Sequence, residues 1–135
     1  MHVDTRHIRV LVVDDDPVFR IPLCAVLAAA GFDVRSAESA EAAETLLAQG
    51  PVDIVLSDVG LPRMDGTTLA ARHPDTPFVL MTGSPPAESA SAALPPSVRA
   101  RLVKPLDIPH LLALLNEAGT SAAVGEATGV RVASR

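Results

Sequence analysis

The sequence has no tryptophan and no tyrosine, and its aromatic residues are three phenylalanines. It therefore lacks the aromatic platform on which the bases of a nucleic acid could stack. Its 11 lysines and arginines are outnumbered by 16 aspartates and glutamates, and they form no basic stripe that could neutralise a phosphate backbone. We therefore expect no direct contact with nucleic acid.

Cysteine is almost absent as well, since Cys24 is the only one. It lies in an apolar helical stretch, where a small core residue of a reducing cytoplasm is expected. No apolar run approaches the roughly 20 residues that a membrane-spanning helix needs, and the N-terminus lacks the apolar segment of a secretory signal. These absences favour a cytoplasmic protein outside the membrane.

What the chain does have is a regular alternation of apolar segments. Its 135 residues are enough for one domain with one core. Short β-branched runs predict strands at 8–13, 32–37, 52–57, 77–81 and 98–103, of which 8–13 and 52–57 are expected to be buried. Longer alanine- and leucine-rich segments predict helices at 17–31, 39–50, 67–73, 87–94 and 108–119. This order predicts an α/β fold with a five-stranded parallel sheet, helices on both faces, an N-terminal arm (1–7) and a flexible tail (119–135).

Polar side chains stand where four of the predicted strands end. They are Asp14 and Asp15 after the first strand, Asp58 after the third, Thr82 after the fourth and Lys104 after the fifth. The carboxyl ends of parallel strands meet at one edge of a sheet, where ligands bind between strands one and three if the order is 2-1-3-4-5. Clustered carboxylates repel one another unless a cation neutralises them, and such oxygen ligands suit Mg²⁺. A metal, an ammonium group and a hydroxyl around a carboxylate suit a phosphoryl group.

Four segments resemble the receiver (REC) domain of two-component response regulators, over residues 8–118. They read VLVVDDDP, DIVLSDVGLPRMDG, VLMTG and LVKPLD, in the order and at the separations of that family. The resemblance implies a flavodoxin-like doubly wound sheet with strand order 2-1-3-4-5. It also implies a signalling phosphoprotein that catalyses only its own phosphorylation and dephosphorylation, with Mg²⁺, or Mn²⁺ in its place, as cofactor.

The resemblance further implies roles for the acidic residues. Asp58 would be the phosphoacceptor, supplied by a sensor histidine kinase or a histidine phosphotransfer protein. The metal site would comprise Asp15, Asp58 and the backbone carbonyl of Gly60, with Asp14 holding a metal-bound water. Asp16 is expected to cap the first helix. The Asp65–Gly66 pair is interpreted as turn chemistry.

Thr82 and Lys104 would contact the phosphoryl oxygens, Thr82 as the switch hydroxyl and Lys104 as a salt-bridge partner of Asp58. The peptide bond of the Lys104–Pro105 pair is expected to be cis. In the family an aromatic residue three positions before the lysine moves together with the threonine, but Arg101 stands there in this chain. Arginine resists burial, so this switch position departs from the family pattern.

Several surface residues are candidates for partner contacts. The first helix can bury Phe19, Leu23, Val26, Leu27 and Ala30. That leaves an apolar patch of Val18, Ile21, Pro22 and Ala25 beside the Asp58 crevice, suited to a helical phosphodonor, although general apolar richness explains it equally well. Leu106 and Leu114 are further candidates, and a dimer could form through the face of the fourth helix, fifth strand and fifth helix. The four histidines lack metal-ligand spacing and are expected at the surface.

We therefore expect a stand-alone receiver in a phosphorelay, acting on an unidentified downstream protein by direct contact. About 16 residues follow the last predicted helix, too few for an effector domain. An alternative is a pseudo-receiver, an interaction module whose binding is uncoupled from phosphorylation by Arg101. A metal-dependent phosphatase with an aspartyl-phosphate intermediate is disfavoured, because the chain leaves no room for a substrate pocket.

Overall fold

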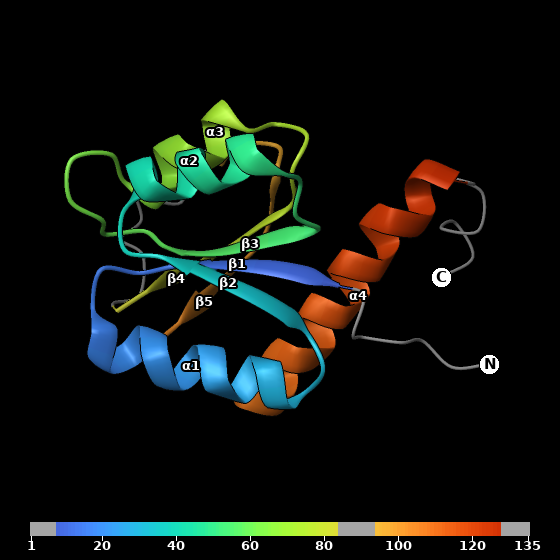
Figure 1. The fold of residues 1–135 in the computed structure, drawn as a ribbon, viewed down its shortest axis with the longest axis horizontal. Coiled ribbons are helices and arrows are strands. Elements are labelled where there is room, and N and C mark those ends of the chain that lie inside the picture. The colour runs from blue at the N-terminus through green and yellow to red at the C-terminus, as the bar shows by residue number, and fades with distance from the viewer. Residues whose placement is uncertain (1–7, 84–93, 128–135) are drawn as a thin grey trace.

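A computed structural model describes residues 8–83 and 94–127 of the chain. Five parallel strands form one sheet in the order β2-β1-β3-β4-β5 (Figure 1). They are β1 (Arg9–Val13), β2 (Asp33–Ala37), β3 (Ile54–Asp58), β4 (Phe78–Thr82) and β5 (Val98–Val103). The predicted fold class and strand order are confirmed.

The described helices are α1 (Pro17–Ala29), α2 (Ala40–Gln49), α3 (Gly66–Arg72) and α4 (Ile108–Ala127). The predicted cap of α1 is confirmed, because the Asp16 carboxylate accepts a hydrogen bond from the backbone N–H of Val18 at 3.0 Å. The side chain of Ser39 caps α2 in the same way. Within the described ranges, no helix combines the length and the apolar character that crossing a membrane requires. Most of the predicted helix at 87–94 and the N-terminal arm lie outside the described residues.

The structure corrects the predicted end of the last helix. α4 continues past Gly119 to Ala127. Gly119 is a close-packing residue rather than a cap, since a β-carbon there would lie 2.7 Å from Cγ2 of Ile8. The alanines that follow it favour a helix. The predicted tail from residue 128 onward lies outside the described part of the chain.

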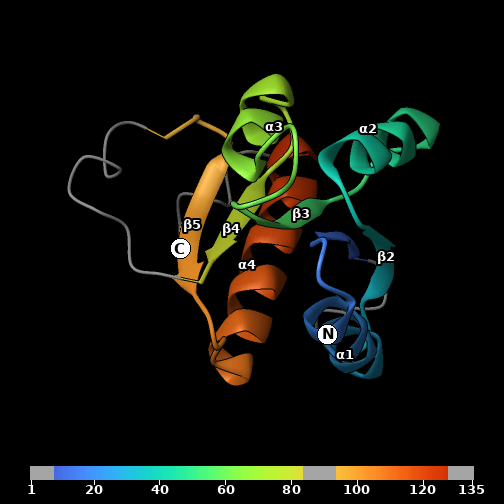
Figure 2. The same cartoon turned by 90° about the vertical axis from the view of Figure 1, so that its left-hand side faces the viewer.

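Helices cover both faces of the sheet. α1 and α4 pack on one face, and α2 and α3 pack on the other (Figures 1 and 2). Successive strand residues alternate between the two, so Val10 and Val12 face α1 and α4 whereas Leu11 and Val13 face α2 and α3. This double burial explains why the three central strands, β1, β3 and β4, are largely apolar, whereas the edge strands β2 and β5 are more exposed and carry charged residues.

The buried face of α1 differs slightly from the prediction. Leu23 and Leu27 are buried as expected, but Val26 is 38% exposed and Cys24 packs against the core instead. The buried face of α1 is therefore the predicted one except that it lacks Val26 and includes Cys24. Val18 and Ile21 are exposed, by 80% and 62%, as predicted.

Candidate functional site

Three aspartates converge at the carboxyl edge of the sheet. Single oxygens of Asp14, Asp15 and Asp58 all lie within 4.8 Å of one another. Their convergence follows from the register, because Val13 of β1 lies opposite Ser57 of β3 and the next residue of each strand is an aspartate. Asp14 is fully buried, Asp58 is partly buried and Asp15 is exposed.

Both the backbone and the carboxylate of Asp14 form hydrogen bonds that hold the residue in place. Its N–H donates to the carbonyl of Ala37 at 3.1 Å, and its carbonyl accepts from Nη1 of Arg20 at 2.7 Å. Its carboxylate accepts from the backbone N–H of Asp16 at 2.9 Å and from Nζ of Lys104 at 2.8 Å. A buried carboxylate needs such partners, and these fix its position.

The carboxyl group of Asp58 lies in a crowded negative environment. Partial burial raises its pKa above the ordinary value, and the charges of Asp14 and Asp15 add to that rise. The ammonium of Lys104 and a hydrogen bond from the backbone of Gly60 oppose it. A bound cation would relieve this crowding, and a set of carboxylate oxygens fits a hard divalent ion such as Mg²⁺.

The ammonium of Lys104 lies between Asp14, which follows β1, and Asp58, which ends β3. Its Nζ is 3.6 Å from Oδ1 of Asp58, the predicted partner, and 2.8 Å from Oδ2 of Asp14, a closer partner that was not predicted. The same Nζ lies 4.0 Å from the centroid of the Phe19 ring. Sequence reasoning placed Phe19 only in the core. The Lys104–Pro105 peptide bond is cis, as predicted.

Thr82 is the last residue of β4, at the same edge of the sheet as the aspartates and Lys104. It follows Met81, the partner of Asp58 in the sheet, and its carbonyl accepts from the backbone N–H of Lys104 at 2.8 Å. Arg101 pairs with Leu80 and is partly buried. Since strand residues alternate, Arg101 and Thr82 lie on the same face of the sheet.

Gly66 allows α3 to begin against the site. Its N–H donates to the carbonyl of Val59 at 2.9 Å. A β-carbon at this position would overlap the carbonyl oxygen of Asp58 and lie 2.8 Å from Oγ of Ser57. The preceding Asp65 caps α3 by accepting from the backbone N–H of Thr68 at 2.8 Å. The Asp–Gly pair therefore starts a helix and permits a close approach, a role that the sequence analysis missed.

The leucines predicted for partner contacts differ from the expectation. Leu106 and Leu114 are partly buried and pack against the core between α1, α4 and the sheet. Leu114 belongs to the edge of the core, because it flanks the buried stripe formed by Leu111 and Leu115. Val18 and Ile21 of the predicted α1 patch are exposed.

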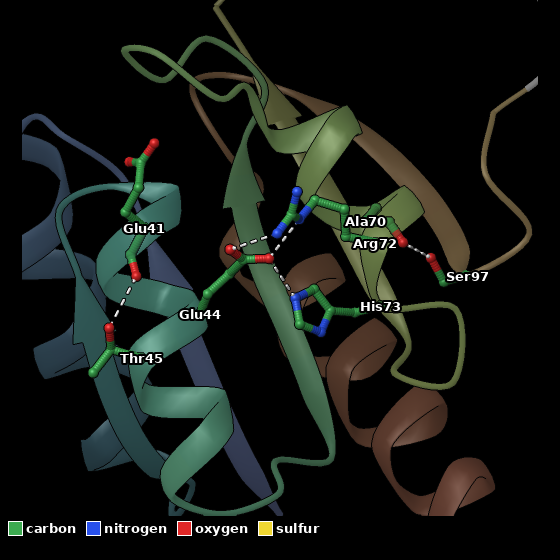
Figure 3. Close-up of polar contacts among 7 residues, drawn as sticks. All are labelled: Glu41, Glu44, Thr45, Ala70, Arg72, His73 and Ser97. Carbon is green, nitrogen blue, oxygen red and sulfur yellow. Dashed lines mark hydrogen bonds and ion pairs between the residues drawn. The ribbon is translucent and has the colours of Figure 1, made fainter.

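His73 has a role that the sequence analysis did not predict. Its Nε2 lies 3.0 Å from Oε2 of Glu44, and Nε of Arg72 donates to the same oxygen at 2.7 Å (Figure 3). The hydrogen bond from Arg72, followed by that from His73, lowers the pKa of the Glu44 carboxyl. These contacts join α2 to the end of α3. Nearby, Oγ of the buried Ser97 donates to the carbonyl of Ala70 at 2.8 Å (Figure 3).

Comparisons with known proteins agree with this geometry. Residues 10–116 match the family described as the response regulator receiver domain. Transcriptional regulatory protein AruR of Pseudomonas aeruginosa is 46% identical over 83 residues, which cover 56% of this chain and 34% of AruR. DNA-binding transcriptional regulator NtrC of Escherichia coli is 38% identical over 114 residues, which cover 81% of this chain and 24% of NtrC. The chain thus spans about a quarter to a third of these relatives.

A solved structure is similar over nearly its whole length. The signal receiver domain of an HD domain-containing protein from Pseudomonas fluorescens Pf-5 superposes with a TM-score of 0.82 at 32% identity. The superposition covers 95% of this chain and 98% of that one. The fold of this chain is therefore that of a known receiver domain.

Proposed function

The chain belongs to the response regulator receiver domain family, and from that premise we propose that it accepts a phosphoryl group on Asp58 in a Mg²⁺-dependent reaction. The donor would be a sensor histidine kinase or a histidine phosphotransfer protein. The phosphorylated domain would then signal through contact with another protein. The observation that carries this proposal is the convergence of three carboxylates with the ammonium of Lys104 at one edge of the sheet.

The transfer step follows from the positions of these groups. An oxygen of Asp58 would bond to phosphorus as the P–N bond of the donor phosphohistidine breaks, and the imidazole would leave with that electron pair. Lys104, whose Nζ already lies 3.6 Å from Asp58, would neutralise the phosphoryl oxygens. The hydroxyl of Thr82, at the end of the neighbouring strand, would donate a hydrogen bond to one of them.

The residues that would hold Mg²⁺ are Asp15 and Asp58, the backbone carbonyl of Gly60, and Asp14 through a bound water. Their carboxylate oxygens are close enough to share one ion. Bound there, the ion would supply charge neutralisation for the transferring phosphoryl group.

The exposed patch on α1 is proposed as the docking surface for the donor. Val18 and Ile21 are large apolar residues that stand in solvent, on the helix whose first turn follows the acidic loop. Ile21→Glu should slow phosphoryl transfer from a histidine phosphotransfer protein and leave phosphorylation by a small-molecule donor unchanged. Equal rates from the protein donor with and without the substitution would remove this docking surface.

A second candidate function is a constitutive interaction module, and the position of Arg101 favours it. A charged, partly buried side chain lies on the Thr82 face, where the family pattern has an aromatic residue. The site could then be phosphorylated without changing the output surface. Equal partner affinity for phosphorylated and unphosphorylated protein would support this candidate over a switch.

The proposed function is tested by intact-mass spectrometry after incubation with Mg²⁺ and an acyl phosphate donor. The expected result is one phosphoryl group per chain, absent from the Asp58→Asn variant and absent when Mg²⁺ is chelated. An unmodified protein, with this donor and with a phosphohistidine protein, would refute the proposal.

A further inference from the structure

The ring of Phe19 forms one wall of the space around the Lys104 ammonium. Nζ lies 4.0 Å from the ring centroid, within the range of an attractive cation–π contact. The side chain of Lys104 is only 20% exposed, so the ammonium is largely removed from competing water. The two residues are far apart in sequence. Lys104 follows β5, and its side chain reaches across to Asp14 after β1, where the ring of Phe19 from α1 meets the ammonium.

Local structure explains why the ring lies there. The cap at Asp16 and Pro17 in the first helical position start α1 directly after the acidic loop. Side chains of an α-helix lean toward its N-terminus, so the ring of Phe19 leans toward the end of β1. In Figure 1 that end of the sheet and the first turn of α1 lie on the same side of the molecule, the side that faces the viewer in Figure 2.

We infer that Phe19 is a positioning residue for Lys104, an inference that rests on the proposed phosphorylation of Asp58. Lysine has a long flexible stem that loses conformational freedom when its end is held in one place. The Phe19 ring and the Asp14 carboxylate together hold the ammonium beside Oδ1 of Asp58 before a phosphoryl group arrives. A group that is already in place needs little reorganisation during the reaction, so the ring increases the rate of phosphoryl transfer.

The electrostatic contribution of the ring is separable from its bulk. Phe19 is partly buried and also packs against the hydrophobic core beneath α1, so a smaller side chain would affect packing as well. Leucine retains an apolar side chain but has no aromatic face, whereas tyrosine keeps the face that attracts a cation. Phe32 provides the matched control, because it is buried in the same core cluster but lies beyond the other end of α1.

The first measurement uses NMR on the unphosphorylated protein and needs no reaction. The εCH₂ protons of Lys104, assigned by their loss in Lys104→Arg, should be shifted upfield by the ring. Phe19→Leu should remove this shift, while Phe19→Tyr and Phe32→Leu should keep it. Lys104 resonances at ordinary positions in the wild-type protein would overturn the inference, as would an upfield shift that persists unchanged in Phe19→Leu.

The second measurement is the rate of phosphorylation by an acyl phosphate donor at saturating Mg²⁺. We expect Phe19→Leu to be about fivefold slower, the effect of losing one partly desolvated cation–π contact, and Phe19→Tyr and Phe32→Leu to stay within about twofold of wild type. Urea unfolding of each variant identifies any that is not folded, and Phe19→Met then replaces Phe19→Leu. A wild-type rate in Phe19→Leu, or equal slowing in Phe32→Leu, would overturn the positioning role. A wild-type protein that takes up no phosphoryl group refutes the proposed function itself, whereas the Lys104 resonances still decide whether the ring holds the ammonium.

Discussion

Replacing Gly66 with alanine should damage both the stability of the domain and its phosphorylation site. The new β-carbon would overlap the carbonyl oxygen of Asp58 and crowd Oγ of Ser57. Because the carbonyl of Asp58 belongs to the backbone, it cannot simply rotate away. Relief would require α3 and the end of β3 to separate, which would also stretch the 2.9 Å hydrogen bond from Gly66 to Val59.

Overpacking of this kind typically costs about 1–3 kcal/mol, and the involvement of backbone places Gly66→Ala at about 3 kcal/mol. The loss is measured by urea unfolding at constant m-value, with Gly50→Ala as the control. Gly50 has no atom near its missing β-carbon and a φ of 175°, so alanine there should change stability by less than about 1 kcal/mol. If Gly66→Ala lowers the free energy of unfolding by less than about 0.5 kcal/mol, the close approach of α3 to Asp58 is refuted.

Three further predictions concern the metal, pH and a buried hydroxyl. Mg²⁺ at ten times its dissociation constant should raise the free energy of unfolding of the wild-type protein by about 1.4 kcal/mol, measured with urea. The gain should be smaller for Asp15→Asn, and an equal gain in that variant would contradict the proposed metal site. The contact with Arg72 lowers the pKa of the Glu44 carboxyl in the folded protein. The contact should therefore add less than about 1 kcal/mol to the free energy of unfolding above pH 4.5, and this gain should be lost as the pH falls through the lowered folded-state pKa. Unfolding of wild type and Glu44→Gln from about pH 3 to 7, on both sides of the ordinary glutamate pKa, checks it, and a pH-independent difference would count against it. Ser97→Ala should cost about 1–2 kcal/mol in the same assay, because the carbonyl of Ala70 loses its 2.8 Å partner; no loss would argue against that bond.

The centre of the sheet was predictable from sequence because β1, β3 and β4 are buried on both faces. Residues such as Val12 and Leu56 belong to continuous apolar runs, and no other arrangement satisfies so many short runs separated by helices. The acidic site was predictable for a related reason. Once the strands are parallel, the residues that follow them meet at one edge, and the register of β1 with β3 places Asp14 beside Asp58.

Features that depend on contacts between distant segments were not predictable. Gly119 resembles a helix end in sequence, and only its contact with Ile8 shows why the helix continues. Phe19 has the spacing of a core residue, and only the tertiary fold brings its ring to the ammonium of Lys104. Similarly, the partner of His73 lies on another helix, at a separation that no local pattern marks.

Identifying the modified residue would test the central claim most directly. The protein is incubated with Mg²⁺ and an acyl phosphate donor, reduced with borohydride to convert an aspartyl phosphate into homoserine, and digested for peptide mass spectrometry. We predict homoserine at position 58 alone, and none when Mg²⁺ is chelated. Homoserine at another aspartate, or equal conversion without Mg²⁺, would contradict the assignment of Asp58 as the phosphoacceptor of a metal-dependent site.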